Sequence, residues 1–338
     1  MAFMNTLLSA EMTNLVGKFL LVLYNAIGDF GWTVVVFTVL LKTVVLPLDI
    51  WQKISMRKQS KAMERIRPQL EKLQKQYANH PDILRQKQAE LQKKEKIHIF
   101  ASCLPMIITI VIFFVVWAGF RALVAYENEV IVEKLMAIYN ENIVKVQAGT
   151  MTMDQLNALL AESYDLHSWL WVKNVFMSDI GTNVIPDIDT FLGTIGATMP
   201  ELSPGLTYDK LVGPAMDMYN KQSFWDAARW NGYFGLPILS IATSFISTKL
   251  MQSQNPQMPT GTEEQQKTQQ TTTKILNYLM PLMLGVFAIM YSAAFAIYYF
   301  LSNVYSTVVS LIFNLIVKRK DKVEKDRLLS TTYVGGRK

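Results

Sequence analysis

Residues 275–317 read ILNYLMPLMLGVFAIMYSAAFAIYYFLSNVYSTVVSLIFNLIV, a run of 43 residues without one charged side chain. A single helix crosses a hydrocarbon core of about 30 Å with about 20 residues, so the run is roughly twice as long as one span requires. It therefore predicts a helical hairpin in a membrane. The turn is expected near Tyr291, Ser292 and Ala293, because the halves on either side are then each about 20 residues long.

Three other segments are long and apolar enough to span a membrane. Residues 101–120 and 230–248 carry no charge, and residues 31–48 carry one, Lys42. The whole chain is 51% hydrophobic and only 18% charged, with a mean hydropathy of +0.18, whereas about a quarter of the positions in soluble domains are charged. The sequence thus predicts an all-α polytopic membrane protein with five transmembrane helices.

The charges between the spans predict the orientation of the chain. Residues 50–98 hold 13 basic and 5 acidic residues, while residues 123–229 hold 6 basic and 14 acidic residues. Because basic flanks stay in the cytoplasm, the first segment is expected inside and the second outside. The tail from Lys318 has 8 basic and 3 acidic residues and fits inside. With five spans, the N-terminus is then outside.

The sequence divides into nine segments. They are an outer-face amphipathic N-terminal segment (1–30), the first span (31–50), a cytoplasmic helical hairpin (51–98), the second span (99–123), an extracytoplasmic segment (124–229), the third span (230–249), a flexible cytoplasmic loop (250–274), the fourth and fifth spans (275–317) and a basic cytoplasmic tail (318–338). The first segment has no basic n-region and no Ala-x-Ala site, so it is expected to stay uncleaved. A sixth span is the alternative interpretation of this segment.

The hairpin segment has a helical apolar pattern on both sides of a turn signal at Asn79-His80-Pro81-Asp82. Pro68 is expected to kink or interrupt the first of its two helices. One interpretation is a solvated linker whose charges only hold the topology; the other is a docking arm for anionic head groups, nascent chains or ribosomal RNA. The tail is expected to anchor to lipid or to grip a partner.

Lys42 is the main functional candidate, because a charge inside a span is costly and usually functional. It lies near the middle of its predicted span and is expected to face a wet cavity. Thr38 stands one turn before it on the same helix face. Further polar candidates are Thr109 in the second span and Ser302, Asn303 and Ser306 in the last. The alternative for the hydroxyl residues is ordinary helix–helix hydrogen bonding.

The sequence disfavours an enzyme. It contains no Gly-x-Ser-x-Gly, His-Glu-x-x-His or Walker loop, and its three histidines lie outside the apolar runs. The single cysteine, Cys103, excludes an internal disulfide, and no Cys/His pair has the spacing of metal ligands. No cofactor or metal site is expected. Transporters often show paired repeats with broken helices, a symmetry that five unequal spans do not show.

Several motifs together resemble the YidC/Oxa/Alb membrane protein insertases. They are Gly31-Trp32, the apolar run containing Lys42, Leu46-Pro47-Leu48, Arg67-Pro68-Gln69-Leu70, Cys103-Leu104-Pro105-Met106, Met280-Pro281-Leu282 and Tyr298-Tyr299-Phe300-Leu301-Ser302-Asn303. Each motif alone is weak, but their order is specific. The resemblance covers roughly residues 15–123 and 230–318.

The resemblance implies five spans around a hydrophilic groove that is open to the cytoplasm and to lipid but closed outside. Lys42 stands where the family usually has an arginine, which keeps the charge but loses the bidentate fork. Thr38, Thr109 and Ser306 fall at polar groove positions, and Ser302 and Asn303 match a Ser-Asn pair of the family. The long outer segment has no counterpart in the simple five-span members. The chain shows neither a lipoprotein cysteine near its start nor a large periplasmic domain before the first span.

The function implied by the resemblance is ATP-independent insertion and folding of membrane proteins in a bacterial plasma membrane, alone or with the Sec translocon. Nascent membrane proteins, the ribosome and membrane lipids are the expected partners. The alternative class is a transporter or channel subunit that binds an anionic solute at Lys42. A third is a structural partner of a larger translocon, active only with other subunits.

Overall fold

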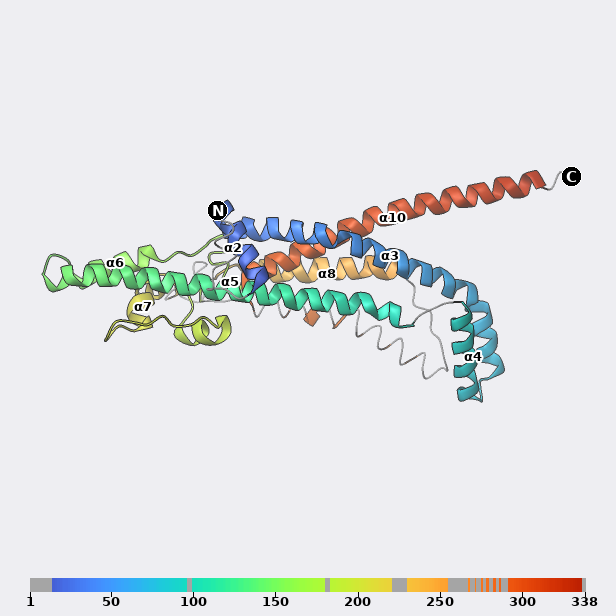
Figure 1. Cartoon of the computed structure of the whole chain (residues 1–338), viewed down its shortest axis with the longest axis horizontal. Helices are drawn as coiled ribbons and strands as arrows, with labels where there is room; N and C mark the ends of the chain where they lie inside the picture. Colours follow the sequence, from blue (N-terminus) through green and yellow to red (C-terminus); the bar gives the residue numbers. More distant parts are fainter. Residues whose placement is uncertain are drawn as a thin grey trace. The chain divides into compact units, whose positions relative to one another are not determined.

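A computed structural model describes residues 14–95, 99–179, 183–220, 230–254 and 291–335, together with isolated residues between 267 and 286. Helices form almost all of its regular structure (Figure 1). They are α2 (Leu15–Ile27), α3 (Phe30–Gln76), α4 (Pro81–Lys94), α5 (Ile99–Gln147), α6 (Met153–Ser163), the π-helix η1 (Thr190–Ile195), α7 (Tyr208–Tyr219), α8 (Gly235–Gln254) and α10 (Ala293–Gly335). Within these residues the β structure is limited to one bridge, between Trp169 and Val172. The all-α prediction is confirmed.

Three helices are long and apolar enough to cross a membrane. Their ranges are Phe30–Gln76 in α3, Ile107–Gln147 in α5 and Ala293–Val323 in α10. The predicted third span corresponds to a shorter apolar helix, Gly235–Leu250, and most of the predicted fourth span lies outside the described residues. Five spans therefore stay a prediction, although α10 begins at Ala293, one of the three residues at which the turn was expected.

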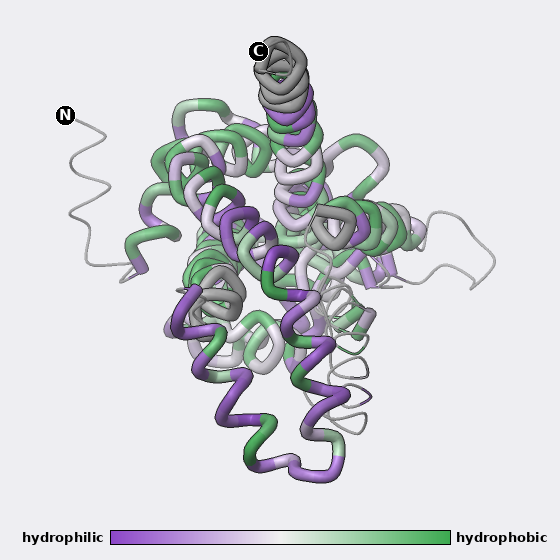
Figure 2. The backbone as a smooth tube through the Cα atoms, turned by 90° about the vertical axis from the view of Figure 1, so that its right-hand side faces the viewer, coloured by the Kyte–Doolittle hydropathy of each residue, from purple (hydrophilic) through white to green (hydrophobic). Residues whose placement is uncertain are grey.

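Helix α3 is continuous from the apolar run into the basic hairpin. Its 47 residues include Pro47 and Pro68 without a break, so the helix is not interrupted at Pro68, while the kink expected there stays a prediction. The chain turns after Gln76 and enters α4 with Pro81 in the first turn, where a missing N–H costs nothing. The two arms pack through Ile66 and Leu70 of α3, with Leu91 of α4 against them. Figure 2 shows hydrophilic residues predominating along this hairpin.

The chain divides into two compact units, and the long helices α3, α5, α8 and α10 contribute to both. The first unit comprises Met1–Leu40, Ile108–Ile241 and Met283–Leu301. The second comprises Leu41–Ile107, Ala242–Leu282 and Ser302–Lys338.

Aromatic side chains form the core of the first unit. Phe120 of α5 lies 5.8 Å from Phe37 of α3 and 6.2 Å from Phe295 of α10, measured between ring centroids. Tyr298 of α10 lies 5.7 Å from Phe120 and is buried with it. Edge-to-face and tilted pairs of this kind add to the free energy gained by burying the rings.

Helix α2 approaches α5 closely at a glycine. Asn14 caps α2 by accepting hydrogen bonds from the backbone N–H groups of Val16 and Gly17 at 3.0 and 3.1 Å. A Cβ at Gly119 of α5 would lie 2.4 Å from Cγ1 of Val16. Gly119 is therefore needed for the two helices to pack at this distance.

The predicted outer segment contains a small folded layer. Met153–Ser163 forms α6 and begins with a capping box between Thr152 and Gln155. Its apolar residues Leu156, Leu159 and Leu160 recur at the helical spacing from which the sequence predicts an amphipathic helix over residues 153–166. Helix α6 packs against α7. Leu156 and Leu160 of α6 and Leu211 of α7 are fully buried, so the segment has a hydrophobic core of its own.

An asparagine pair ties the stretch around Asn174 to the residues just before α8. The Asn231 side chain donates to the carbonyl groups of Asn174 and Ser178 at 2.8 and 3.0 Å and accepts from the Asn174 N–H at 2.7 Å. Both asparagines are buried. These hydrogen bonds satisfy buried polar groups that no longer contact water. The pair therefore fixes the backbone of residues 174–178.

The same stretch reaches α10. The N–H groups of Ala293 and Ala294 donate to the carbonyls of Met177 and Val175, each at 2.8 Å. We call residues 174–179, with Asn231, the outer clasp. It holds the first residues of α8 and α10 within one hydrogen-bonded network.

Candidate functional site: a row of cations between α3 and α10

Helices α3 and α10 run parallel in the second unit, and basic residues of α3 face α10. Three contacts set this direction, because the residue numbers rise together on both helices. Lys42 pairs with Ser306, Lys53 with Ser310, and Arg57 with Asp321. The C-terminal ends of the two helices therefore point the same way.

Lys42 is half-buried and donates a hydrogen bond to Oγ of Ser306 at 3.3 Å, which is long for this kind of bond. An ammonium group has three donors, so one neutral hydroxyl leaves most of its bonding capacity unused. Across the described part of the chain, no carboxylate lies within ion-pair distance of it. The side chain is thus a cation in an apolar helix, turned toward a polar partner. Its role in a groove stays a prediction.

Lys53 is a candidate that the sequence interpretation missed. Its Nζ donates to Oγ of Ser310 at 2.8 Å, and Ser310 donates to the carbonyl of Ser306 at 2.7 Å. Lys42 and Lys53 are about 16 Å apart along α3, but their partners are only about 6 Å apart along α10. The two long side chains therefore converge on one turn of α10, where Asp49 of α3, which interacts electrostatically with both lysines, offsets part of their positive charge.

Ser302 and Asn303 lie earlier on α10. Ser302 is buried. The buried Nδ2 of Asn303 has no hydrogen-bond partner among the described residues, although its backbone carbonyl accepts from Thr307 at 2.8 Å. A buried donor of this kind gains free energy when an acceptor or a water reaches it.

The remaining two predicted site residues belong to the first unit. Thr38 is buried and donates to the carbonyl of Val34 at 2.7 Å, which is the ordinary back-bonding of a helical threonine. Thr109 is exposed on α5. The structure therefore joins Lys42 and Ser306 among the six candidates, and it gives Thr38 a local structural role.

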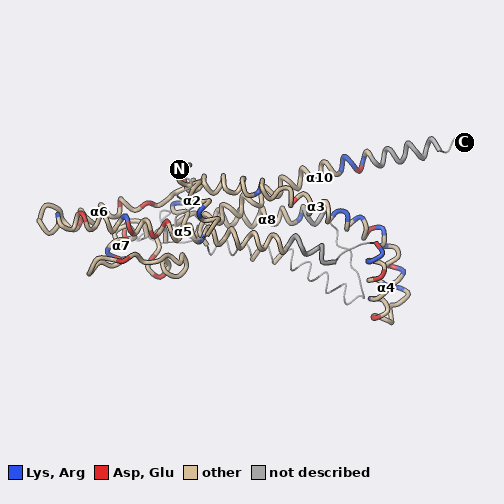
Figure 3. Tube along the Cα trace, in the orientation of Figure 1, with Lys and Arg blue, Asp and Glu red and all other residues tan. Residues whose placement is uncertain are grey.

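The charges of the molecule are separated by element (Figure 3). Lys and Arg crowd the last part of α3, α4 and residues 318–322 of α10, while Asp and Glu predominate on the layer of α6 and α7. Among the residues that the structure describes, no three His, Cys, Asp or Glu side chains are placed to hold a metal ion. The contacts between α3 and α10 place lysines beside hydroxyl groups, an arrangement that can attract anions.

Parts of the sequence are similar to known proteins. A relative from Fusobacterium nucleatum, named membrane protein insertase YidC, is 34% identical over 113 residues, which is 32% of this chain and 53% of the relative. Relatives of the same name from Caldanaerobacter subterraneus and Leptospira interrogans are 32% and 37% identical over 35% and 28% of this chain. The matched part spans 53% of the former and 14% of the latter.

The sequence model of the family described as 60Kd inner membrane protein matches residues 22–320. This range includes the first two long apolar helices, α8, the predicted outer segment and most of the third long apolar helix, Ala293–Val323. The protein is accordingly a multi-pass membrane protein. Since the match covers most of its length, the chain belongs to the 60Kd inner membrane protein family, the YidC/Oxa family that its motifs resemble.

Proposed function

We propose that the protein is an ATP-independent insertase and chaperone that inserts membrane proteins into a bacterial plasma membrane and helps them fold. The observation that carries this proposal is the convergence of Lys42 and Lys53 on Ser306 and Ser310 between apolar helices. Membership in a family with relatives named membrane protein insertase YidC supports it. In this proposal the N-terminus lies outside, the C-terminus lies in the cytoplasm, and the protein itself is not an enzyme.

The proposed mechanism lowers the barrier for moving a short hydrophilic segment across the membrane. Polar backbone and side chains without partners in hydrocarbon cost several kcal/mol each, on the order given by transfer data. A groove with lysines and hydroxyl groups replaces part of the lost water. Lys42 attracts acidic residues of the outgoing segment, and transfer of about 20 apolar residues into lipid then makes insertion downhill.

The other predicted groove residues have different roles in the proposal. Ser306 orients Lys42, while Ser302 and Asn303 offer hydrogen bonds to the passing backbone. The unpartnered Nδ2 of Asn303 supports this role. Thr109 extends the polar lining in this proposal, whereas Thr38, predicted to do the same, already bonds through its hydroxyl to the carbonyl of Val34. Nascent membrane proteins are the clients, and the basic hairpin and tail receive them from the ribosome, with the Sec translocon or without it, at a surface of anionic lipids.

Lys42→Ala is expected to reduce insertion of a client with an acidic N-terminal tail about fivefold to tenfold, because losing one favourable charge contact of about 1 kcal/mol changes a rate by this order. Lys42→Arg is expected to retain most of the activity, since the charge is kept. The measurement is protease protection of a short single-span client in liposomes that contain only this protein.

A client with a neutral tail is the control, and Lys42→Ala should change its insertion little. Equal insertion of the acidic client by the wild type and by Lys42→Ala would contradict the electrostatic mechanism. No protection above empty liposomes would contradict autonomous insertion, and the next measurements would be insertion with the Sec translocon added and anion flux that depends on Lys42.

A further inference from the structure

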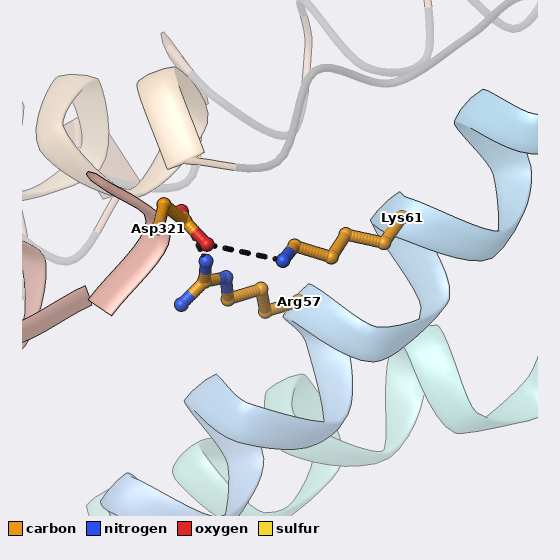
Figure 4. Close-up of polar contacts among 3 residues, drawn as sticks. All are labelled: Arg57, Lys61 and Asp321. Atoms are coloured by element: carbon orange, nitrogen blue, oxygen red, sulfur yellow. Dashed lines mark hydrogen bonds and ion pairs between the residues drawn. The ribbon is translucent and has the colours of Figure 1, made fainter. Parts of the chain in front are cut away.

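The cation row of α3 ends in a pair of side chains that share one carboxylate of α10. Arg57 and Lys61, one turn apart, both contact Asp321 (Figure 4). Nη2 of Arg57 binds Oδ2, and Nζ of Lys61 binds Oδ1 at 3.2 Å. The carboxylate is therefore held through both of its oxygen atoms. We call these three residues the distal triad.

Cations are in excess around the distal triad. Asp321 is the one acidic residue in the sequence KRKDK at positions 318–322, and residues 53–67 of α3 hold six basic residues against Glu64. One aspartate neutralises only a small part of this charge. A second carboxylate that came close would still meet a strongly positive surface.

The triad is open to solvent. The side chains of Lys61 and Asp321 are 47% and 45% exposed, and that of Arg57 is 25% exposed. Ion pairs between exposed side chains contribute little net stability, because water and salt compete for both partners. Asp321 is therefore held in place but is easily exchanged for another carboxylate.

The row leads from the triad to the proposed groove. Lys53 lies one turn before Arg57 on α3, and Lys42 lies three turns further along the same face. Contacts with α10 show that all four cations face this helix. A carboxylate that has replaced Asp321 thus finds the next cation about 6 Å away along the helix axis.

We propose that Arg57 and Lys61 form a capture site for acidic residues in the unfolded N-terminal segment of a client, and that Asp321 occupies this site until the client displaces it. The occupant is a peptide carboxylate because the present occupant is one. The row of cations also continues from the triad into the apolar part of α3. A polypeptide that is being inserted can follow such a row, whereas a lipid head group stays at the membrane surface. The inference rests on the proposed insertase function and adds the position of the first contact.

The test uses the full-length protein in nanodiscs of neutral lipid and a fluorescent peptide of about ten residues with four glutamates. Fluorescence anisotropy reports its binding. Asp321→Asn is expected to tighten binding about fivefold, because the internal competitor is gone while the shape is kept. Arg57→Gln combined with Lys61→Gln is expected to reduce binding to the level of a peptide with glutamine in place of glutamate.

Matched controls separate the site from general charge. Lys58→Gln removes one exposed cation from the same helix outside the triad, and Asp326→Asn removes one acid from the same tail; both should change binding less than twofold. Unchanged or weaker binding by Asp321→Asn would overturn the proposal. So would loss of the Asp321→Asn effect when anionic lipid is added to the nanodiscs, because the site would then belong to lipid head groups.

Failure of the capture site is distinguishable from failure of the insertase function. Peptide binding does not require insertion, so it can be measured whether or not the protein inserts the client. In liposomes, Asp321→Asn should accelerate insertion of the acidic client and leave the neutral client unchanged. Tighter peptide binding without any insertion by the wild type would support the site and contradict the insertase function.

Discussion

Asp179 of the outer clasp is a buried carboxyl group with one satisfied oxygen. Its Oδ2 accepts from the N–H of Leu236 at 2.7 Å, at the start of α8, while Oδ1 has no hydrogen-bond partner among the described residues. A Cβ at Gly232 would lie only 1.6 Å from Oδ1, so the backbone approaches the carboxylate as only glycine allows. Burial raises the pKa of Asp179 to about 6, although the Leu236 N–H opposes the shift.

This raised pKa predicts a pH dependence of stability. The folded state binds the proton more tightly than the unfolded chain, whose aspartates have a pKa near 3.9. The stabilising contribution is therefore complete below about pH 4 and is lost as the pH rises through about 6. Asp179→Asn removes this group's titration and keeps an acceptor for Leu236.

The measurement is the thermal midpoint in detergent at pH 4, 5, 6 and 7. The difference between Asp179→Asn and the wild type isolates this group, and it should shift in favour of the variant by on the order of 1 kcal/mol between pH 4 and 7. A difference that stays constant over this range would show that the carboxyl group does not titrate there.

At the scale of single residues, the sequence predicts the exceptional charge but not its partners. Lys42 was identifiable because it interrupts an apolar run, and hydroxyls at i, i+4 spacing pointed to Ser302 and Ser306. Lys53 lies beyond the expected end of the span, in a segment rich in basic residues. Nothing in the sequence therefore distinguishes it from its basic neighbours. Lys53 lies three turns after Lys42 on the same face of α3, but only its contact with Ser310 in the structure identifies it as a site residue.

At the scale of elements, the contact between α2 and α5 depends on the size of one residue. Gly119→Ala is expected to lower the free energy of unfolding by about 1–3 kcal/mol, the usual cost of overpacking, because its Cβ would overlap Val16. Thermal unfolding in detergent measures this loss. Val16→Ala in the same chain should restore part of it.

Gly193→Ala in η1 is the matched control. A Cβ at Gly193 would meet nothing within 4 Å, and the next residue is not proline, so this change should be neutral or slightly stabilising in a helix. Equal losses for Gly119→Ala and Gly193→Ala would mean that the contact between α2 and α5 does not depend on side-chain volume.

Helix periodicity and turn signals predict several elements and two of their boundaries. The region of α6 was expected, and the turn before α4 and the start of α10 fall where Asn79–Asp82 and Tyr291–Ala293 indicated. The break expected at Pro68 is absent because each proline removes only one hydrogen bond, and Pro47 and Pro68 are both exposed, so neither ring disturbs packing. Packing of Ile66 and Leu70 on α4 then outweighs the local loss.

At the scale of the whole molecule, the charge asymmetry predicts which segments lie on which side of the membrane. In a Cys103→Ser background, a membrane-impermeant maleimide applied to intact cells should label Asp154→Cys of α6. It should not label Glu90→Cys of α4 or Lys322→Cys of α10 until the membrane is opened. The last two should behave alike, because α3 and α10 run parallel and α4 packs on α3.

The reverse pattern of labelling would contradict the predicted orientation, and labelling of Glu90→Cys alone would contradict the shared side of hairpin and tail. Composition and charge thus predict an all-α membrane protein with basic and acidic ends. They do not predict the outer clasp, because Asn174, Asn231 and Asp179 have ordinary frequencies and spacings and become partners only in three dimensions.

The outer clasp also has a consequence for the order in which hydrogen bonds can form while the chain is being synthesised. Val175 and Met177 bond to Ala294 and Ala293, which are made more than a hundred residues later. At translation rates of about 5–20 residues per second, this stretch waits roughly 6–24 s for its last partners. Residues 174–179 therefore leave the ribosome without two of the hydrogen bonds that hold them in the folded protein, and the clasp closes only after the start of α10 has been made.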